Sequence, residues 1–259
     1  MRITALMIGL VITLLITTGA SHADAEAPAA KAYRALVKEY DEEGGARLFA
    51  KRFIKLAEQH PRDPVATDAL LWVVKNVRGR PDTTRALRLL ASDHVESSKL
   101  APMFKDIAGS RSLAAEELLR AVLAKSSDKH NRGQAAYYLA ALLDLEASLV
   151  QQLQAQPELA PSVRRYYGKE YGEHLLSRDL SELAKQRELV YERIQKSFSD
   201  VELQDTTLGT IADKMLFQIR HLSVGRVAPD IVGEDILGKD LKLSHFRGNV
   251  VMLAFWGHW

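Results

Sequence analysis

The chain of 259 residues contains no cysteine. None of its own residues can therefore form a disulfide or supply a thiol, which excludes a disulfide-stabilised scaffold. An excess of one charge is also lacking: 35 basic residues face 33 acidic ones, so we expect no nucleic-acid partner. The densest basic stretch, Arg78 to Arg88, is more typical of a solvated helix start than of its alternative, a phosphate site.

Motifs that mark several enzyme classes are missing as well. The sequence has no Gly-x-Ser-x-Gly, no phosphate-binding glycine loop and no Rossmann fingerprint. Its eight histidines include no pair at the helical spacing of three or four residues, and no set of carboxylates surrounds them in the sequence. We therefore expect no zinc or di-iron site and no bound cofactor.

The N-terminal residues 1–23 have the pattern of a secretory signal peptide. Arg2 precedes an apolar stretch from Ile3 to Ala20, and small residues follow at Ser21 and Ala23. This pattern predicts cleavage before Asp24 and an exported protein, located in the periplasm or cell envelope of a bacterium. An uncleaved membrane anchor is the alternative, because the apolar stretch is close to the roughly 20 residues that span a bilayer.

Apolar residues recur at helical spacing after residue 45. Phe49, Phe53 and Leu56 occupy one face of a helix, which the prolines after His60 end. Helix pairs that start near residues 46, 82 and 112 are about 30 to 36 residues apart, the repeat length of tetratricopeptide-like (TPR-like) arrays, although an irregular helical bundle has similar spacings. Further helices are predicted over 65–77, 99–108, 113–125, 131–153, 180–198 and 208–221, with Asp82, Ser97 or Ser98, Ser112 and Asn131 as N-caps.

These patterns predict a mostly α protein in five parts. They are a signal peptide (1–23), a linker with a first helix (24–45), a helical repeat-like domain (46–155), further helices (156–222) and the incomplete start of an α/β domain (225–259). The fourth part contains a group of tyrosines at Tyr166, Tyr167 and Tyr171. Packing between helices is the favoured interpretation of this group, and a ligand platform is the alternative.

The last part, 225–259, has a β pattern. Val250 to Phe255 is an unbroken apolar run rich in β-formers, as in a strand that is buried on both faces of a sheet. Asp230 to Ile236 and Asp240 to Leu243 are shorter extended candidates, joined through Gly238 as in a hairpin. Residues 244–248 are predicted to form a capped turn that leads into the apolar strand.

Specific residues recur in a fixed order along this part. They are Ala228, Pro229, Asp230, Gly238, Leu243, Ser244, Phe246, Arg247, Gly248, Phe255, Trp256 and Trp259. Their order resembles the redoxin (AhpC/TSA, TlpA-like) branch of the thioredoxin superfamily. The sequence departs from that family at Asn249, where Lys is usual, and at Gly257-His258, where Ala-Thr or Ala-Ser is common, but neither change affects a reacting group.

The resemblance implies the start of a thioredoxin-like domain and an activity in thiol–disulfide exchange with a protein substrate or redox partner. In the family, the first cysteine of a Cys-x-x-Cys pair follows the residue matched by Trp259. It lies at a helix N-terminus, where backbone N–H groups and the helix dipole favour the thiolate. The chain has no cysteine, so we expect a fragment that is inactive as it stands, with no catalytic residue of its own. His258 would lie beside the thiols and could tune their pKa, although a surface residue without such a role is the more frequent case.

Two alternatives stay open. One is a non-catalytic binding module of the cell envelope, in which the helical repeats bind a partner protein and the C-terminal part is a relic. The other is a peroxiredoxin-like antioxidant protein. Peroxiredoxins, however, usually follow this strand with Phe-x-Pro and a lone cysteine in a Thr-x-x-Cys setting, whereas this sequence continues with Trp256-x-x-Trp259.

Overall fold

The computed structural model describes residues 28–77, 81–223 and 225–256. They form eleven α-helices and two short antiparallel hairpins, so the protein is mostly α, as predicted. The helices are α1 (Pro28–Glu43), α2 (Ala46–Gln59), α3 (Pro64–Asn76), α4 (Pro81–Asp93), α5 (Phe104–Gly109), α6 (Leu113–Lys125), α7 (Lys129–Ala155), α8 (Ala160–Tyr167), α9 (Lys169–Ser177), α10 (Leu180–Ser197) and α11 (Leu208–Phe217). The strands are β1 (Glu202–Leu203), β2 (Thr206–Thr207), β3 (Val232–Glu234) and β4 (Asp240–Lys242), and the shorter helical turns are η1 (Ser98–Met103), η2 (Pro157–Leu159), η3 (Gln218–Leu222) and η4 (Leu243–Phe246).

Several helices begin at polar side chains that satisfy free backbone amides of the first turn. Ser112 accepts a hydrogen bond from the amide of Ala115 and precedes α6, as predicted. Asp63 accepts from the amide of Val65 in α3, where Pro64 occupies the first helical position. The other side-chain caps are Ser97 for η1, Asp128 for α7, Asp179 for α10 and Thr207 for α11.

Two predicted caps are wrong, and one predicted helix is divided. α4 begins at Pro81, a residue suited to the first helical position, so Asp82 lies inside the first turn. α7 is capped by Asp128, whose carboxylate accepts from two amides of the first turn, and Asn131 is a buried residue within that turn. The predicted helix over 99–108 consists of the 3-10 turn η1 and the short α5, because Pro102 lies inside it.

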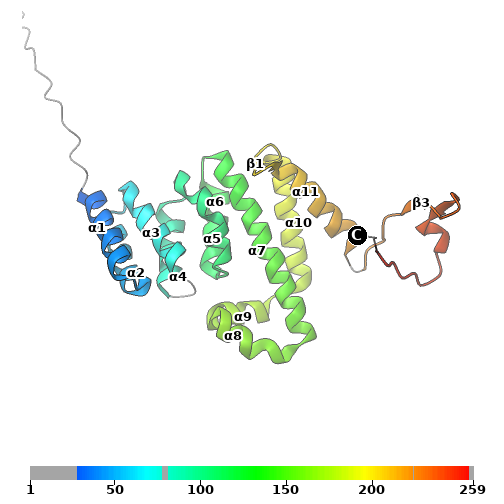
Figure 1. Ribbon diagram of the computed structural model, residues 1–259, viewed down its shortest axis with the longest axis horizontal. Helices are drawn as coiled ribbons and strands as arrows, with labels where there is room; N and C mark the ends of the chain where they lie inside the picture. The colour runs from blue at the N-terminus through cyan, green and yellow to red at the C-terminus, as the bar shows by residue number, and fades with distance from the viewer. Residues whose placement is uncertain (1–27, 78–80, 224, 257–259) are drawn as a thin grey trace, which may run out of the picture.

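The helices form a row in which most pack on the next helix of the chain or the next but one, whereas α7 packs on α10, three helices later. α2 packs on α1 and α3, α3 on α4, α4 on α6, α6 on α7, α7 on α10, and α10 on α11. Figure 1 shows this order from α1 to α11, with α8 and α9 packed on each other as a short arm outside the row. The predicted helix starts near residues 46, 82 and 112 correspond to Ala46, Pro81 and Leu113.

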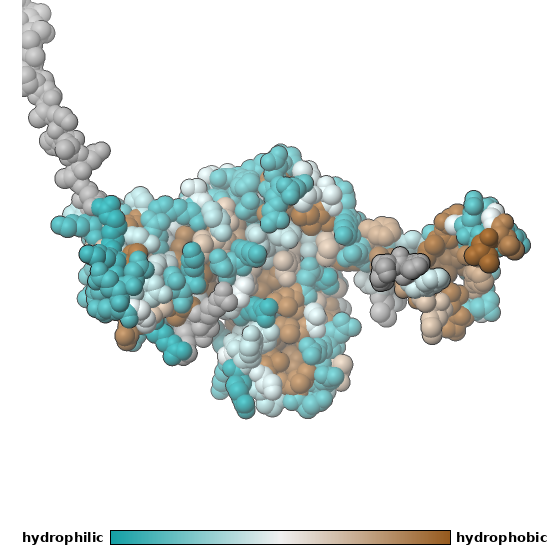
Figure 2. Space-filling view, viewed as in Figure 1, coloured by the Kyte–Doolittle hydropathy of each residue, from teal (hydrophilic) through white to brown (hydrophobic). Residues whose placement is uncertain are grey.

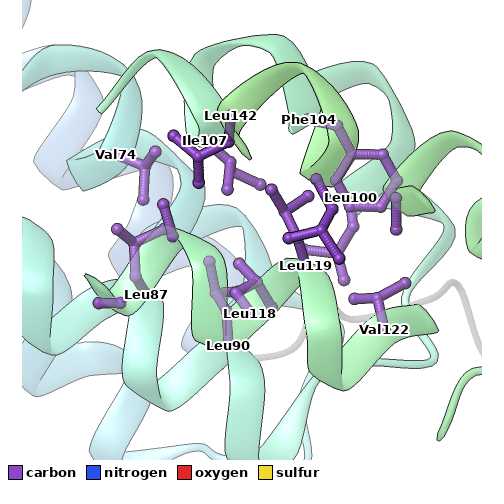
Figure 3. Close-up of a cluster of buried hydrophobic side chains, with 14 of the residues drawn as sticks. Val74, Leu87, Leu90, Leu100, Phe104, Ile107, Leu118, Leu119, Val122 and Leu142 are labelled. Carbon is purple, nitrogen blue, oxygen red and sulfur yellow. The ribbon is translucent and has the colours of Figure 1, made fainter. Parts of the chain in front are cut away.

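A continuous apolar core runs along this row. Figure 3 shows part of this core, to which Leu90 of α4, Phe104 of α5 and Leu119 of α6 belong, each with no exposed surface. Nearer the N-terminus, Phe53 of α2 stacks on Trp72 of α3 with ring centroids 4.0 Å apart. Because most helices of the row bury their apolar faces against helices close to them in the chain, contacts of short range in sequence supply much of the core.

Residues 225–256 form a hairpin segment beyond α11 (Figure 1). β3 and β4 pair antiparallel within the predicted extended stretches, with Val232 opposite Lys242.

The predicted strand over 250–255 does not form. Residues 250–256 have no regular secondary structure, and Val250 and Phe255 are exposed. The physical reason is that a strand needs a neighbour for its backbone groups, and no described strand pairs with this run. Figure 2 shows the resulting concentration of apolar residues on this segment.

Candidate functional site

The family-motif residues of the C-terminal segment are joined through the side chain of Asp230. Its carboxylate accepts two hydrogen bonds from Ser244, each 2.7 Å long, one from the hydroxyl and one from the backbone amide, although the two residues are 14 positions apart. These bonds, with the hydroxyl first, lower the pKa of Asp230. The amide of Leu243 donates to the carbonyl of Ile231 at 2.9 Å. The start of the segment and the turn after β4 therefore form one hydrogen-bonded unit.

Two glycines of the motif lie where the backbone turns sharply. Gly238 has a φ of 75°, a left-handed conformation that glycine adopts without steric cost, and Gly248 has a φ of 89°. Beside Gly238, the carboxylate of Asp235 accepts from the amides of Leu237 at 2.8 Å and Lys239 at 3.0 Å. These bonds close the turn between β3 and β4.

The structure brings together only part of the predicted motif. Pro229, Asp230 and Arg247 line one hollow of about 240 Å³. Phe255 and Trp256 take no part in it and are 89% and 88% exposed. The hollow is lined by one acidic and one basic side chain but by no thiol, so these residues cannot exchange disulfides by themselves.

A second candidate site, which the sequence patterns did not indicate, is a buried polar cluster where α6, α7 and α9 meet. Glu146 of α7 has no exposed surface. Its carboxylate accepts hydrogen bonds from the Tyr171 hydroxyl at 2.9 Å and from Arg178 Nη2 at 2.8 Å. Glu116 of α6 lies beside it and forms an ion pair with Arg120 at 2.6 Å. The cluster links the α8–α9 arm to the row of helices.

His174 of α9 lies between the two carboxylates of this cluster. Its Nε2 is 3.5 Å from Glu146 Oε1 and 3.9 Å from Glu116 Oε2. The three residues place one ligand atom each within 4.8 Å of one another, and their atom types suit a divalent cation such as zinc. The fold thus brings two carboxylates close to a histidine. The sequence analysis did not predict this arrangement, because the histidines are scattered along the chain.

The arginines beside these carboxylates argue against a metal site. Arg120 pairs with Glu116, and Arg178 Nη2 lies 2.8 Å from Glu146 and 3.9 Å from Glu116. Two positive charges therefore balance two negative ones, and a divalent cation would add uncompensated charge to a largely buried region. We interpret the cluster as an ion-pair network that fixes α9 against α6 and α7.

The charges of the network are visible in the pKa values of its members. Burial by itself raises the pKa of Glu146, but its contact with His174, the hydrogen bonds from Arg178 and Tyr171 and the charge of Arg178 outweigh burial and hold that pKa below its ordinary value. The pKa of Tyr171 is raised, by burial and then by the charge of Glu146. Glu146 is therefore an ionised acceptor and Tyr171 a neutral donor.

A similar but smaller link joins α7 to α10. The Asp144 carboxylate accepts a hydrogen bond from Arg187 and another from the Tyr191 hydroxyl, the latter at 2.7 Å. Burial and the charge of Asp144 raise the pKa of Tyr191. Like the first network, this one connects helices that pack on each other.

One sequence signal could have indicated the larger network. Tyr171, His174 and Arg178 recur at intervals of three and four residues and so project from one side of a helix. A row of polar side chains on one side of a helix predicts polar partners on the helices that it contacts. Two members of the tyrosine group do pack between helices: Tyr167 at the end of α8 meets Tyr171 of α9 edge to face, at 5.9 Å between ring centroids. The third, Tyr166, is 78% exposed.

Comparisons with protein-family models, with curated proteins and with solved structures give no match to this chain. Among the described residues, no helix has both the length and the apolar character that crossing a membrane requires. The signal peptide predicted over 1–23 lies outside the described residues, as do Arg78, His258 and Trp259.

Proposed function

We propose that residues 225–256 are the start of a redoxin-type thioredoxin-like domain and that the protein takes part in thiol–disulfide exchange outside the cytoplasm. The observation that supports this most is the pair of hydrogen bonds between Asp230 and Ser244, which joins two separated pieces of the motif into one unit. The left-handed conformations of Gly238 and Gly248 support it as well, since the motif has glycine at both positions.

In this proposal the chemistry belongs to a dithiol that follows Trp259 in the resembled family. A low-pKa thiolate attacks one sulfur of a substrate disulfide, forms a mixed disulfide and releases the other substrate sulfur as a thiolate. The second thiol of the pair then displaces the substrate, which leaves reduced with both electrons. The enzyme pair ends as a disulfide, which a donor dithiol must reduce again. In this chain, the bonds between Asp230 and Ser244 and the turn at Gly238 form the start of the domain that carries that dithiol in the resembled family.

The nucleotide sequence beyond the codon for Trp259 provides a first test. We expect a codon for cysteine, followed by a second cysteine codon three positions later. The protein translated with those residues should reduce insulin disulfides in the presence of dithiothreitol, and the chain ending at Trp259 should not. A downstream frame without such a pair, or equal turnover by the cysteine-free chain, contradicts the proposal. Turnover of peroxide without insulin reduction favours the peroxiredoxin-like alternative.

A second function is favoured by a specific observation in the helical part. The neighbour-on-neighbour packing of α2 to α7 resembles that of TPR-like repeats, and we propose that this part binds a partner protein of the cell envelope. Affinity capture from a periplasmic extract, with the chain as bait, tests this proposal. Retention of a partner that a chain denatured before coupling does not retain supports it, and identical retention by both contradicts it.

A further inference from the structure

A cleft of the helical part lies between α4 and the α8–α9 arm and has a volume of about 760 Å³. One wall is the face of α4 from Pro81 to Ser92. The opposite wall consists of Arg111, the first turn of α6, and the junction of α8 and α9 at Tyr167 and Lys169. This volume falls in the range of about 300–1,000 Å³ that is typical of ligand sites.

The charge of the cleft is predominantly positive. Four basic residues line it, whereas Glu170 is its only acidic residue among those described. Arg85 pairs with Glu58 at 2.5 Å, and Arg88 lies 3.2 Å from Glu170. The other two basic residues are Arg111 and Lys169, and neither has a carboxylate partner among the described residues. Two positively charged side chains on one wall are therefore available to bind an anionic ligand.

Arg111 is held in place by a neutral partner. Its Nη1 donates a hydrogen bond to the Tyr167 hydroxyl at 3.1 Å, and its guanidinium lies 5.8 Å from the centroid of the Tyr167 ring. These contacts orient the guanidinium without neutralising it. A guanidinium fixed in this way presents its remaining N–H groups to a carboxylate at a lower entropic cost than a free side chain does.

The shape of the cleft distinguishes an extended peptide from a small anion. The α4 wall from Pro81 to Ser92 is roughly 16 Å long at about 1.5 Å per residue, which matches about five residues of an extended chain at roughly 3.3 Å each. The apolar side chains of Leu89 and Leu113 also line the cleft. Such a surface suits a chain that carries both carboxylates and apolar side chains.

We propose that this cleft binds a short acidic segment of a partner protein, with its carboxylates on Arg111 and Lys169 and its apolar side chains on Leu89 and Leu113. This inference rests on the proposal that the helical part binds a partner protein, and it specifies the chemistry of that partner. It is independent of residues 225–259 and of any thiol chemistry. The basic stretch that the sequence singled out contributes Arg85 and Arg88 to the same cleft.

Fluorescence anisotropy of the whole chain with three labelled peptides tests the inference. The peptides are Glu-Leu-Asp-Leu-Glu, its neutral form Gln-Leu-Asn-Leu-Gln and its charge-reversed form Lys-Leu-Lys-Leu-Lys. We expect the acidic peptide to bind most tightly and its affinity to fall as salt is raised. Arg111→Gln and Lys169→Gln should each weaken this binding about tenfold, the effect expected for loss of one charge-assisted contact. The matched control Arg165→Gln, an exposed arginine of α8 outside the cleft, should leave it unchanged.

Circular dichroism melting of each variant verifies that its fold is retained. Equal affinity for the acidic and the charge-reversed peptides overturns the inference, as does equal binding by Arg111→Gln, Lys169→Gln and Arg165→Gln. Binding of inorganic phosphate, detected by calorimetry, without binding of the acidic peptide also overturns it. If only the neutral or the basic peptide binds, the assigned ligand chemistry is wrong while the proposed binding module stands. The proposal that the helical part binds a partner protein is tested separately: it fails if the native and the denatured chain retain the same proteins from the periplasmic extract.

Discussion

Replacement of Glu146 by alanine should destabilise the protein far more than replacement of an exposed glutamate. Glu146 has no exposed surface and accepts hydrogen bonds from Tyr171 and Arg178. Without its carboxylate, the Arg178 guanidinium keeps only Glu116, at 3.9 Å, and the Tyr171 hydroxyl loses its acceptor. Removal of one partner from a buried ion pair costs about 3–5 kcal/mol of unfolding free energy, because the other charge stays buried without compensation.

The arm offers a matched control in Glu173, which lies on α9 with Tyr171 and His174. Its ion pair with Arg164 is 2.7 Å long, but both side chains are close to half exposed. Exposed pairs of this kind contribute about 0–1 kcal/mol, so Glu173→Ala should change the unfolding free energy little. Comparison of the two variants shows whether a loss of stability comes from the buried charge of Glu146 or from the loss of any glutamate in or beside the arm.

The same network predicts a dependence on pH. The folded-state pKa of Glu146 lies below its ordinary value, so its ionised form contributes stability that is fully present above the unfolded-state pKa, about 4.3 for Glu. This contribution is lost as the pH falls through the folded-state pKa. The difference in unfolding free energy between the natural protein and Glu146→Gln should therefore be largest near neutral pH and should shrink in acid, below about pH 4.

Urea unfolding followed by far-UV circular dichroism measures these differences. Equal unfolding free energies for Glu146→Ala and Glu173→Ala, within about 0.5 kcal/mol, would refute the reasoning. In that case the arm would be held by its apolar contacts, with Leu175 at its centre, rather than by the ion pairs. A Glu146→Gln difference that does not change between neutral and acid pH would refute the pH argument in particular.

Three further outcomes are expected. Leu119→Ala should cost about 2–5 kcal/mol of unfolding free energy, because Leu119 has no exposed surface. Leu48 is 77% exposed, so Leu48→Ala should cost less than about 0.5 kcal/mol. Equal denaturation midpoints for the two variants contradict this expectation. Gly209→Ala should lower the melting temperature, because the new Cβ would lie 2.8 Å from the carbonyl oxygen of Ser199; an unchanged melting temperature would show that this backbone contact relaxes freely. After expression in a Gram-negative host, mass spectrometry of the periplasmic fraction should find Asp24 as the first residue, and uncleaved soluble protein in the cytoplasm argues against export.

The sequence by itself was sufficient for much of the helical part because helices depend on local signals. The apolar spacing around Phe53 and the prolines after His60 predicted α2 and its end, and Ser112 predicted the start of α6. The prediction was wrong at Asp82 and Asn131. A proline or a second capping residue nearby competes for the same turn, and periodicity does not decide between them.

In the C-terminal segment, the turn residues predicted the hairpin, but the apolar run over 250–255 did not form the predicted strand. A turn such as the one at Gly238 depends on a few neighbouring residues and their backbone conformations. A strand is completed by hydrogen bonds to another strand, which composition alone does not supply. The sequence pattern was therefore sufficient for the local geometry around Asp230 and Gly238, but it did not determine whether residues 250–255 pair with another strand.

Only the tertiary structure revealed the buried network and the cleft. Glu116, Glu146 and His174 belong to three helices, and no sequence spacing relates them. Their meeting depends on how α9 folds back against α6 and α7, which is a matter of packing between helix faces. The same return of the chain brings Lys169 to the cleft that Arg88 also lines. Part of the basic stretch, for which the sequence favoured a solvated helix start, thus lies on one wall of a charged cleft. Local signals determine where helices lie along the chain, whereas packing between distant residues determines which charges share a site.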